Sequence, residues 1–369
     1  MTMKQSSPNA PRSGVVRRVL EFALPGWFKE RSEVDIQLDQ ARRMAAFTKR
    51  PAPSRDRVNI DRFKDTEENE RRRYTDQTPI SEGRTAVVYR ANDSRLKRTV
   101  AIKRFRDDPR INSDTDYLAE RDSAATVRHT NVVSTYDADR DEHGAFITME
   151  FLRGQNAQQA VRDGGAFNLD RFVRFADDVL EGLSAVHRGG LLHLDIKPTN
   201  IMVSEQAGGT EVAKLVDFGR ARPIRDKDGN APRGRGLEGS IYFTSPEQLL
   251  SEELDETCDI YCLGCVFYWM LAGRRPFTAP NSFELKEAHL QSWVLPLHKV
   301  AQDLPEDLCQ WVMSPIKANK ADRPQSAEAM LQALRDADWY VDEDATRRSQ
   351  VDLPRIPTAT EKLRKRKAE

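Results

Sequence analysis

Residues 191–200 read LLHLDIKPTN, which sets an aspartate, a lysine and an asparagine close together after a leucine-rich run. The run KLVDFG at 214–219 follows and adds a second aspartate, Asp217. Carboxylate and amide oxygens are the ligands that Mg²⁺ prefers, so Asn200 and Asp217 are candidates for a metal site. Asp195 is then a carboxylate that is free for acid–base chemistry, and the two runs together indicate a reaction centre.

Residues upstream supply groups that bind phosphate. VAIK at 100–103 ends a predicted strand at Lys103, and Glu120, on a predicted helix, is a candidate to pair with that lysine. The run ISEGRTAVVY at 80–89 places a glycine just before another predicted strand. A lysine, two metal-binding oxygens and a free carboxylate are what phosphoryl transfer requires, because the phosphates must be held, their charge neutralised and the attacking hydroxyl oriented.

Composition and charge exclude several classes of protein. The chain has 369 residues, of which 38% are hydrophobic and 31% are charged, and its 58 Lys and Arg balance its 58 Asp and Glu. This is an ordinary globular balance, and it favours no partner by net charge. The longest apolar run, at about 261–272, is too short to span a bilayer, so no membrane span is expected. Residues 1–14 carry no apolar core, so we expect no secretory signal and interpret the chain as cytoplasmic.

Three regions differ in character. Residues 1–72 are predicted to be an N-terminal extension, partly helical and partly linker-like, because Pro- and Ser-bearing stretches flank apolar residues at helical spacing. Residues 73–337 begin with β-branched runs separated by a turn and continue with mostly helical apolar spacing. This order indicates a small strand-rich lobe followed by a larger helical lobe. Residues 338–369 are predicted to be a polar, basic tail.

The motifs occur together in an order known from one family. The chain resembles the eukaryotic-like (Hanks-type) serine/threonine protein kinases over about 73–337, on VAIK, HLDIKPTN, VDFG, the SPE at 245–247 and the ADRP at 321–324. The resemblance implies an α+β, bilobal protein-kinase-like fold with a small β-rich N-lobe and a larger helical C-lobe. It also implies ATP-dependent phosphorylation of serine and threonine hydroxyls on protein substrates, with ATP and Mg as cofactors.

The resemblance implies a role for each residue that matches a catalytic motif. Lys103 would contact the α- and β-phosphates, with Glu120 as its partner on a helix. Asp195 would be the base that accepts the proton of the substrate hydroxyl, and Lys197 would reach the transferred phosphate. Lysine two positions after the base is the form typical of serine/threonine kinases.

The metal and nucleotide sites follow from the same motifs. Asn200 and Asp217 would hold Mg²⁺. Apolar side chains would lie above and beneath the adenine, Met149 would be the gatekeeper, and backbone groups just after it would bond the base. The residues implied in nucleotide binding are Ile80, Gly83, Val88, Ala101, Lys103, Met149, Glu150, Leu152 and Met202.

Two buried supports and two departures from the family pattern also follow. The supports are an ion pair between Glu247 and Arg323 and a brace from Asp259 to the backbone of the catalytic loop, residues 193–200. The residue before the base is usually arginine and is Leu194 here, which makes the chain a non-RD type, with HLD in place of HRD. An apolar Leu194 is expected to pack into the lobe and to need no phosphate for charge balance.

The second departure is the phosphate loop. It keeps only Gly83 of three glycines, with Ser81 and Ala86 in the other places. Glycine permits positive φ and close backbone approach, so we expect a stiffer loop that still leaves its amides accessible. This departure would affect the rate of transfer more than the binding of ATP.

Two other functions compete with an active protein kinase. A pseudokinase, which is a nucleotide-binding signalling scaffold, is favoured by the reduced glycine loop. It is opposed by Lys103, Asp195, Asn200 and Asp217, because a scaffold has no need of a base. A small-molecule kinase of related fold is disfavoured by the SPE and ADRP motifs, which belong to the protein-kinase activation segment and its supports.

Three further patterns lie outside the catalytic motifs. Cys258, Cys262 and Cys265 have the spacing of a [4Fe–4S] cluster site, but they lie in a predicted buried helix and are interpreted as small core residues. The basic run at 362–367 is a weak hint of nucleic acid or anionic lipid, and we interpret it as a solvated tail, so no nucleic-acid partner is expected. The aromatic stretch around Trp27 would dock either on the kinase domain or on a protein partner.

Overall fold

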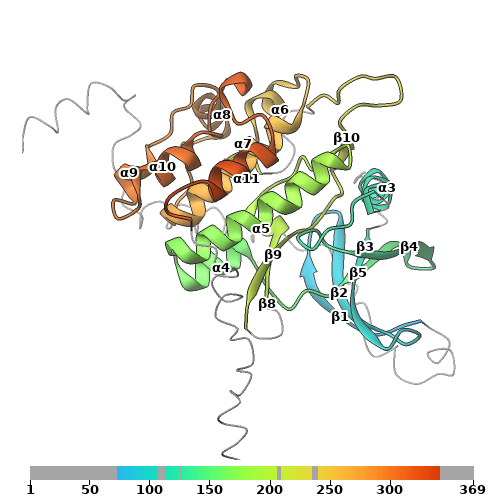
Figure 1. Ribbon diagram of the computed structural model, residues 1–369. Coiled ribbons are helices and arrows are strands. Elements are labelled where there is room, and N and C mark those ends of the chain that lie inside the picture. Colours follow the sequence, from blue (N-terminus) through green and yellow to red (C-terminus); the bar gives the residue numbers. More distant parts are fainter. Residues whose placement is uncertain (1–72, 107–112, 125, 206–208, 235–239, 341–369) are drawn as a thin grey trace, which may run out of the picture. The chain divides into compact units, whose positions relative to one another are not determined.

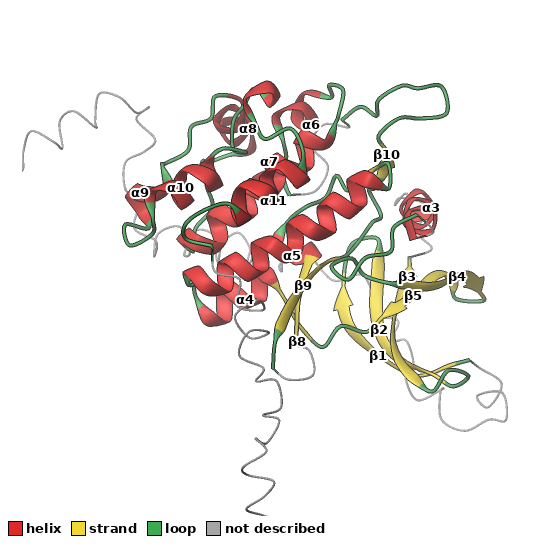
Figure 2. Cartoon of the chain, in the orientation of Figure 1, coloured by secondary structure: helices red, strands yellow, loops and turns green. Residues whose placement is uncertain are grey.

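The structure is a computed structural model that describes residues 73–106, 113–124, 126–205, 209–234 and 240–340. The predictions for the N-terminal extension and the basic tail concern residues 1–72 and 341–369, which lie outside the described residues. The described chain begins with an antiparallel sheet and continues with a mostly helical part (Figures 1 and 2).

The sheet has five strands in the order β1-β2-β3-β5-β4, and all neighbours are antiparallel. Its strands are β1 (Tyr74–Glu82), β2 (Ala86–Asp93), β3 (Arg98–Phe105), β4 (Thr135–Asp141) and β5 (Gly144–Glu150). The predicted hairpin of β-branched runs is confirmed as β2 and β3. Their turn is held by Asp93, whose Oδ1 accepts the amides of Arg95 and Leu96 at 3.0 and 3.1 Å.

The two faces of this sheet have different roles, because successive side chains of a strand point to opposite sides. One face is an apolar core of Ala91, Val100, Ile102 and Phe146, with Tyr74 and Tyr89 packed against it. The register places Val88 opposite Lys103, and Ala101 opposite Met149. These four residues therefore share the other face of the sheet, which is the face that carries the predicted nucleotide-binding side chains.

The helices of the described chain follow the sheet except for α3, which comes between β3 and β4. The helices are α3 (Ser113–Ala124), α4 (Ala157–Gly164), α5 (Leu169–Arg188), α6 (Pro246–Leu250), α7 (Glu256–Ala272), α8 (Ser282–Leu290), α9 (Leu297–Val300), α10 (Glu306–Met313) and α11 (Ala327–Arg335), with 3-10 turns η4 (Pro198–Asn200), η5 (Ile241–Phe243) and η6 (Lys320–Asp322). Phe172 on α5 packs edge-on against Phe267 on α7 at 5.3 Å between ring centroids. Arg335 on α11 donates to Asp177 on α5 at 2.7 Å.

Helix α7 explains the longest apolar run of the sequence. Its N-cap Asp255 accepts the amide of Thr257, and it ends at Gly273, whose φ of 64° suits a residue without a side chain. Cys258, Cys262 and Cys265 are fully buried within this helix, as predicted from their position. Burial raises the pKa of all three thiols, so they behave as small apolar core residues.

Short strands inside the helical part were not predicted. They are β6 (Gly154–Asn156), β8 (Ile201–Glu205) and β9 (Glu211–Leu215) in one sheet, and β7 (Leu191–Leu192) with β10 (Arg222–Pro223) in another. Strands of two to five residues are too short for an alternating pattern to stand out from helical spacing. They matter because β7, β8 and β9 flank the catalytic loop and Asp217.

The molecule therefore has the α+β, bilobal architecture of a β-sheet region followed by a helical region. Within the described ranges, every helix is too short or too polar to cross a bilayer.

We expect the described domain to fold without the first 68 residues. Arg73 is already anchored in the sheet, because its guanidinium donates to Asp137 at 2.7 Å and to Asp93 at 3.1 Å. A chain that begins at Asn69 should show one cooperative thermal transition near that of the full chain, measured by circular dichroism. A chain that begins at Asp76 lacks Arg73 and should melt at a lower temperature. Failure of the Asn69 chain to fold, while the full chain is stable, would contradict this expectation.

Candidate active site

Lys103 is the centre of an ion-pair cluster that joins three separate elements. From β3, its Nζ lies 2.5 Å from Glu120 Oε2 on α3 and 2.6 Å from Asp217 Oδ1, just after β9. The predicted pairing of Lys103 with Glu120 is therefore present. The Lys103 and Glu120 side chains are only 10% and 4% exposed, whereas Asp217 is 40% exposed. The cluster brings the two halves of the site together and leaves part of the Asp217 carboxylate accessible to a ligand.

Burial and charge act in opposite directions on this cluster. Burial alone would lower the pKa of Lys103, but the charges and hydrogen bonds of Asp217 and Glu120 outweigh it and hold that pKa above its ordinary value. Burial would raise the pKa of Asp217, but the charge and hydrogen bond of Lys103 outweigh it and hold that pKa well below its usual range. Asp217 is therefore ionised at neutral pH, as a metal-binding carboxylate must be.

The catalytic loop brings together Asp195, Lys197 and Asn200. Asp195 Oδ2 accepts from Lys197 Nζ at 2.6 Å and from Asn200 Nδ2 at 2.9 Å. Both neighbours therefore hold the Asp195 carboxylate in place, and its role as the base stays a prediction. The Asn200 Nδ2 also donates to the Asp195 carbonyl at 2.9 Å, which fixes the amide so that its oxygen is the atom it can offer to a metal.

Asp259 braces the catalytic loop, as predicted. This fully buried residue of α7 accepts the amides of His193 and Leu194, both at 2.8 Å, and pairs with His187 Nε2 at 3.0 Å. Leu194 has a φ of 62°, a left-handed conformation that costs about 1–2 kcal/mol for a residue with a side chain. The Asp259 carboxylate offsets this cost because it ties down two consecutive amides of the strained turn.

The Leu194 side chain packs into the helical lobe, as expected for an apolar residue at this position. It is 8% exposed and belongs to a buried cluster with Leu192, Leu254 and Cys258, against which Ile224 packs. The cluster joins strand β7, the start of α7 and the segment just after β10. Leu194 therefore links the catalytic loop to its surroundings by apolar contact.

The predicted nucleotide-binding residues come from five strands, the β1–β2 turn and the segment after β5. Val88, Ala101, Lys103 and Met149 line one face of the five-stranded sheet, as the strand register shows. The others lie on β1, in the β1–β2 turn, at and after the end of β5, and on β8, namely Ile80, Gly83, Glu150, Leu152 and Met202. Ile80 is 51% exposed, which leaves its surface available for contact.

The phosphate loop differs from expectation in one respect. Gly83 does not adopt a positive φ, and its amide donates to the Ala86 carbonyl at 2.9 Å, so this amide is engaged in the turn. Arg106 closes the turn further, because Nε donates to the Gly83 carbonyl at 3.3 Å and Nη2 pairs with Glu82. The turn is thus held by its own backbone and by one arginine, and the stiffness of the loop stays a prediction.

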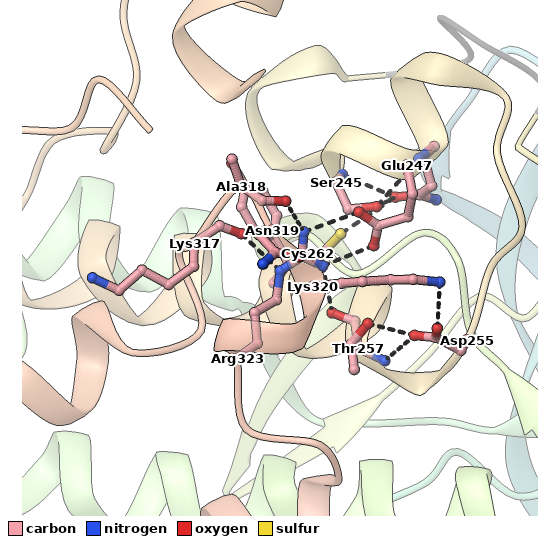
Figure 3. Close-up of polar contacts among 12 residues, drawn as sticks. Ser245, Glu247, Asp255, Thr257, Cys262, Lys317, Ala318, Asn319, Lys320 and Arg323 are labelled. Carbon is pink, nitrogen blue, oxygen red and sulfur yellow. Dashed lines mark hydrogen bonds and ion pairs between the residues drawn. The ribbon is translucent and has the colours of Figure 1, made fainter. Parts of the chain in front are cut away.

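The buried ion pair between Glu247 and Arg323 is present (Figure 3). Arg323 Nη1 and Nη2 donate to the two Glu247 oxygens at 2.8 and 2.9 Å. The remaining guanidinium donors reach the carbonyls of Thr257, Lys317 and Ala318. Glu247 ends the SPE motif and Arg323 lies in ADRP, so this contact fixes the end of the segment that begins at Asp217.

One polar contact near the site was not predicted. Lys214 Nζ on β9 lies 2.8 Å from both oxygens of Glu150, at the end of β5. The Ser134 amide donates to Glu150 Oε1 at 2.7 Å. The Glu150 side chain thus ties the sheet to the strand that leads into Asp217. Opposite charges at the ends of two apolar strands were the only sequence signal for this pair.

Comparisons with known proteins agree with this geometry. The model of the protein kinase domain family matches residues 74–334. A probable serine/threonine-protein kinase of Clostridium acetobutylicum is 29% identical over 277 residues, which cover 74% of this chain and 41% of that protein. The serine/threonine-protein kinase PknB of Mycobacterium tuberculosis is 31% identical over 255 residues, covering 67% of this chain and 40% of PknB. A probable PknB of Bifidobacterium longum is 33% identical, over 65% of this chain and 36% of that protein.

The chain spans less than half the length of these three relatives. The matched region is the part that holds Lys103, Asp195, Asp217 and the ion pair of Glu247 with Arg323. The family match spans all of these residues, and the chain belongs to the protein kinase domain family.

Proposed function

We propose that this protein transfers the γ-phosphoryl group of ATP to serine and threonine hydroxyls of protein substrates. The observation that carries the proposal is the double ion pair of Lys103, whose Nζ contacts Glu120 and Asp217 together. A lysine held by a helix on one side and by the metal-binding segment on the other is oriented toward bound phosphates. The serine/threonine class is supported by Lys197, which contacts Asp195, and by the names of the relatives.

The residues fit Mg²⁺ and ATP. Asn200 and Asp217 would hold the metal, because they offer an amide oxygen and an ionised, part-exposed carboxylate, an all-oxygen set of the kind Mg²⁺ prefers. Mg²⁺, when bound, neutralises charge on the phosphates. The adenine would lie against the sheet face of Val88, Ala101 and Met149, which is apolar beside Lys103.

The proposed chemistry uses Asp195 and Lys197. The substrate hydroxyl oxygen forms a bond to the γ-phosphorus as the bond between that phosphorus and the β–γ bridging oxygen breaks, and ADP is the leaving group. Asp195 accepts the hydroxyl proton, and Lys197, 2.6 Å from Asp195, is placed to stabilise negative charge on the transferred group. Asn200 holds Asp195 by two hydrogen bonds, which reduces the ways in which the base can turn.

The experiment that tests the proposal is incubation of the full chain with radiolabelled ATP and Mg²⁺, scored for labelled serine and threonine. We expect incorporation by the wild-type protein and none by Asp195→Ala. The pseudokinase alternative has one observation in its favour, the Gly83 amide that is engaged in its own turn. Nucleotide binding without Asp195-dependent label would favour the pseudokinase.

We expect activity that does not depend on phosphorylation of the activation segment, residues 217–247. Leu194 brings no charge, so no phosphate is needed to neutralise it, and the segment has other anchors. Strand β10 pairs with β7, and the Ile224 amide donates to the Gly190 carbonyl at 2.8 Å. Further along, the Gly234 amide donates to the Glu252 carbonyl at 3.0 Å.

The measurement for this expectation is the initial rate toward a generic protein substrate before and after dephosphorylation confirmed by intact mass. The two rates should agree within a few-fold, even where Ser240 or Thr244 had been modified. A tenfold fall that recovers on rephosphorylation, equivalent to about 1.4 kcal/mol of transition-state stabilisation, would contradict the role given to Leu194.

A further inference from the structure

Gln248 joins the end of the activation segment to the catalytic loop. It lies on α6, directly after Glu247, and its side-chain Nε2 donates to the Leu194 carbonyl at 3.1 Å. Its Oε1 accepts from the Ser245 amide at 3.0 Å and from the Ser245 hydroxyl at 3.1 Å. The Cys262 thiol on α7 reaches the same oxygen at 3.5 Å. Ser245 and Cys262 lie close to Glu247 and Arg323 in this part of the helical lobe (Figure 3).

These contacts fix the orientation of the Gln248 amide. Its oxygen faces the Ser245 amide and its nitrogen faces the Leu194 carbonyl, so a flipped amide would lose both of these hydrogen bonds. The capping box formed by Ser245 and Gln248 at the start of α6 also holds the side chain against the helix. Gln248 is therefore a rigid donor aimed at one backbone atom of the catalytic loop.

The atom it contacts belongs to the strained residue next to Asp195. Leu194 has a φ of 62°, and Asp259 holds its amide at 2.8 Å. Gln248 holds the carbonyl of the same residue. The two polar backbone groups of Leu194 are thus bonded by side chains from different helices, α7 and α6. Because the Leu194 carbonyl and the Asp195 amide form one rigid peptide group, the contact from Gln248 also sets the plane from which Asp195 projects.

We propose that Gln248 is a positioning residue for Asp195. Through Gln248, the end of the activation segment at Glu247 controls the orientation of the base. The inference rests on the proposed phosphoryl transfer. The link is a neutral amide, so it requires no phosphate or counter-ion. It complements the apolar packing of Leu194, since one contact holds the side chain of that residue and the other holds its carbonyl.

The sharpest test is Gln248→Glu in the full chain. The variant keeps the shape of the side chain and the oxygen that accepts from Ser245 and Cys262. When ionised, however, the introduced carboxylate has no proton to donate, and its second oxygen would repel the Leu194 carbonyl oxygen. When protonated, the same carboxyl group can still donate to that carbonyl. The ratio of kcat for the variant to kcat for wild type should therefore be highest at acidic pH and should fall as pH rises and the introduced carboxyl group loses its proton. At the highest pH measured, we expect kcat of the variant to be about tenfold below that of wild type, with KM for ATP nearly unchanged.

Gln325→Glu is the matched control. Gln325 also donates through Nε2 to backbone carbonyls, those of Arg323 at 2.7 Å and Lys320 at 3.1 Å, but it does not contact the catalytic loop. The same chemical change there should shift the melting temperature at most, and its kcat relative to wild type should not vary with pH. A merely structural role for Gln248 would make the two variants behave alike.

A second variant and a second measurement keep the inference testable. Gln248→Met removes the donor without adding charge, so its kcat should fall at every pH, by the same factor. Hydrogen exchange of the amides in residues 191–200 should be faster in both Gln248 variants than in wild type, and unchanged in Gln325→Glu. If wild type shows no Asp195-dependent transfer, the proposed function fails, and hydrogen exchange alone decides the role of Gln248. A kcat ratio for Gln248→Glu that is flat with pH, or wild-type exchange in both Gln248 variants, overturns the inference.

Discussion

Asp195→Asn should reduce phosphoryl transfer by about 10²- to 10⁴-fold, the range over which a general base contributes to catalysis. The amide cannot accept the hydroxyl proton, although it has the shape of the carboxylate. Nucleotide affinity should stay close to the wild-type value, because the side chain of Asp195 bonds to Lys197 and Asn200, whereas Lys103 pairs with Glu120 and Asp217. The measurements are single-turnover transfer from ATP and the dissociation constant of Mg·ATP for each protein.

The matched control is the same chemical change at Asp217. Asp217→Asn removes a carboxylate that is ionised beside Lys103 and that we propose as a metal ligand. This variant should lose transfer and should also bind nucleotide more weakly in the presence of Mg²⁺ than wild type does. When Mg²⁺ is chelated, Asp217→Asn and wild type should bind the nucleotide with similar affinity. Wild-type turnover in Asp195→Asn, or equal effects of the two variants on nucleotide affinity, would show that the roles are assigned wrongly.

The parts of the site that the sequence predicted depend on residue type and on the family motifs. Lys103 and Asp259 each carry a charge in an apolar run, and a buried charge requires a partner of the opposite sign or a set of hydrogen bonds. The residues themselves suggested the pair of Lys103 with Glu120, the family resemblance implied the pair of Glu247 with Arg323, and the structure contains both pairs. The α+β architecture followed in the same way from strand-like runs that precede helical ones.

The parts that the sequence did not predict depend on how distant segments approach each other. Glu150 and Lys214 are 64 positions apart, and Gln248 and Leu194 are 54 apart, so no local spacing signals either contact. The left-handed backbone of Leu194 could not be predicted from the sequence either. Glycine or asparagine at a position can indicate a positive φ, but leucine does not. That conformation exists because Asp259, on a distant helix, holds the neighbouring amides.

The second large effect concerns stability, and it is expected for Arg323→Met. The Arg323 and Glu247 side chains are 0% and 4% exposed, and the guanidinium uses all five of its N–H donors, two on Glu247 and three on backbone carbonyls. Removal of one partner of a buried pair leaves an uncompensated charge, which costs about 3–5 kcal/mol. The free energy of unfolding in urea should fall by this amount at neutral pH.

Variants of the pair and of a surface pair separate the causes of this loss. In Arg323→Met, the Glu247 carboxylate would stay buried without its cation, and both of its oxygens would lose their hydrogen bonds from the guanidinium. The double variant Arg323→Met/Glu247→Leu removes the orphaned carboxylate and should recover part of the loss, but not all of it, because three carbonyls still lack a donor. Arg335→Met breaks a similar contact to Asp177, with a side chain 38% exposed, and should cost about 1 kcal/mol or less. If Arg323→Met were no more destabilised than Arg335→Met, the buried pair would not be what holds the end of the activation segment in place.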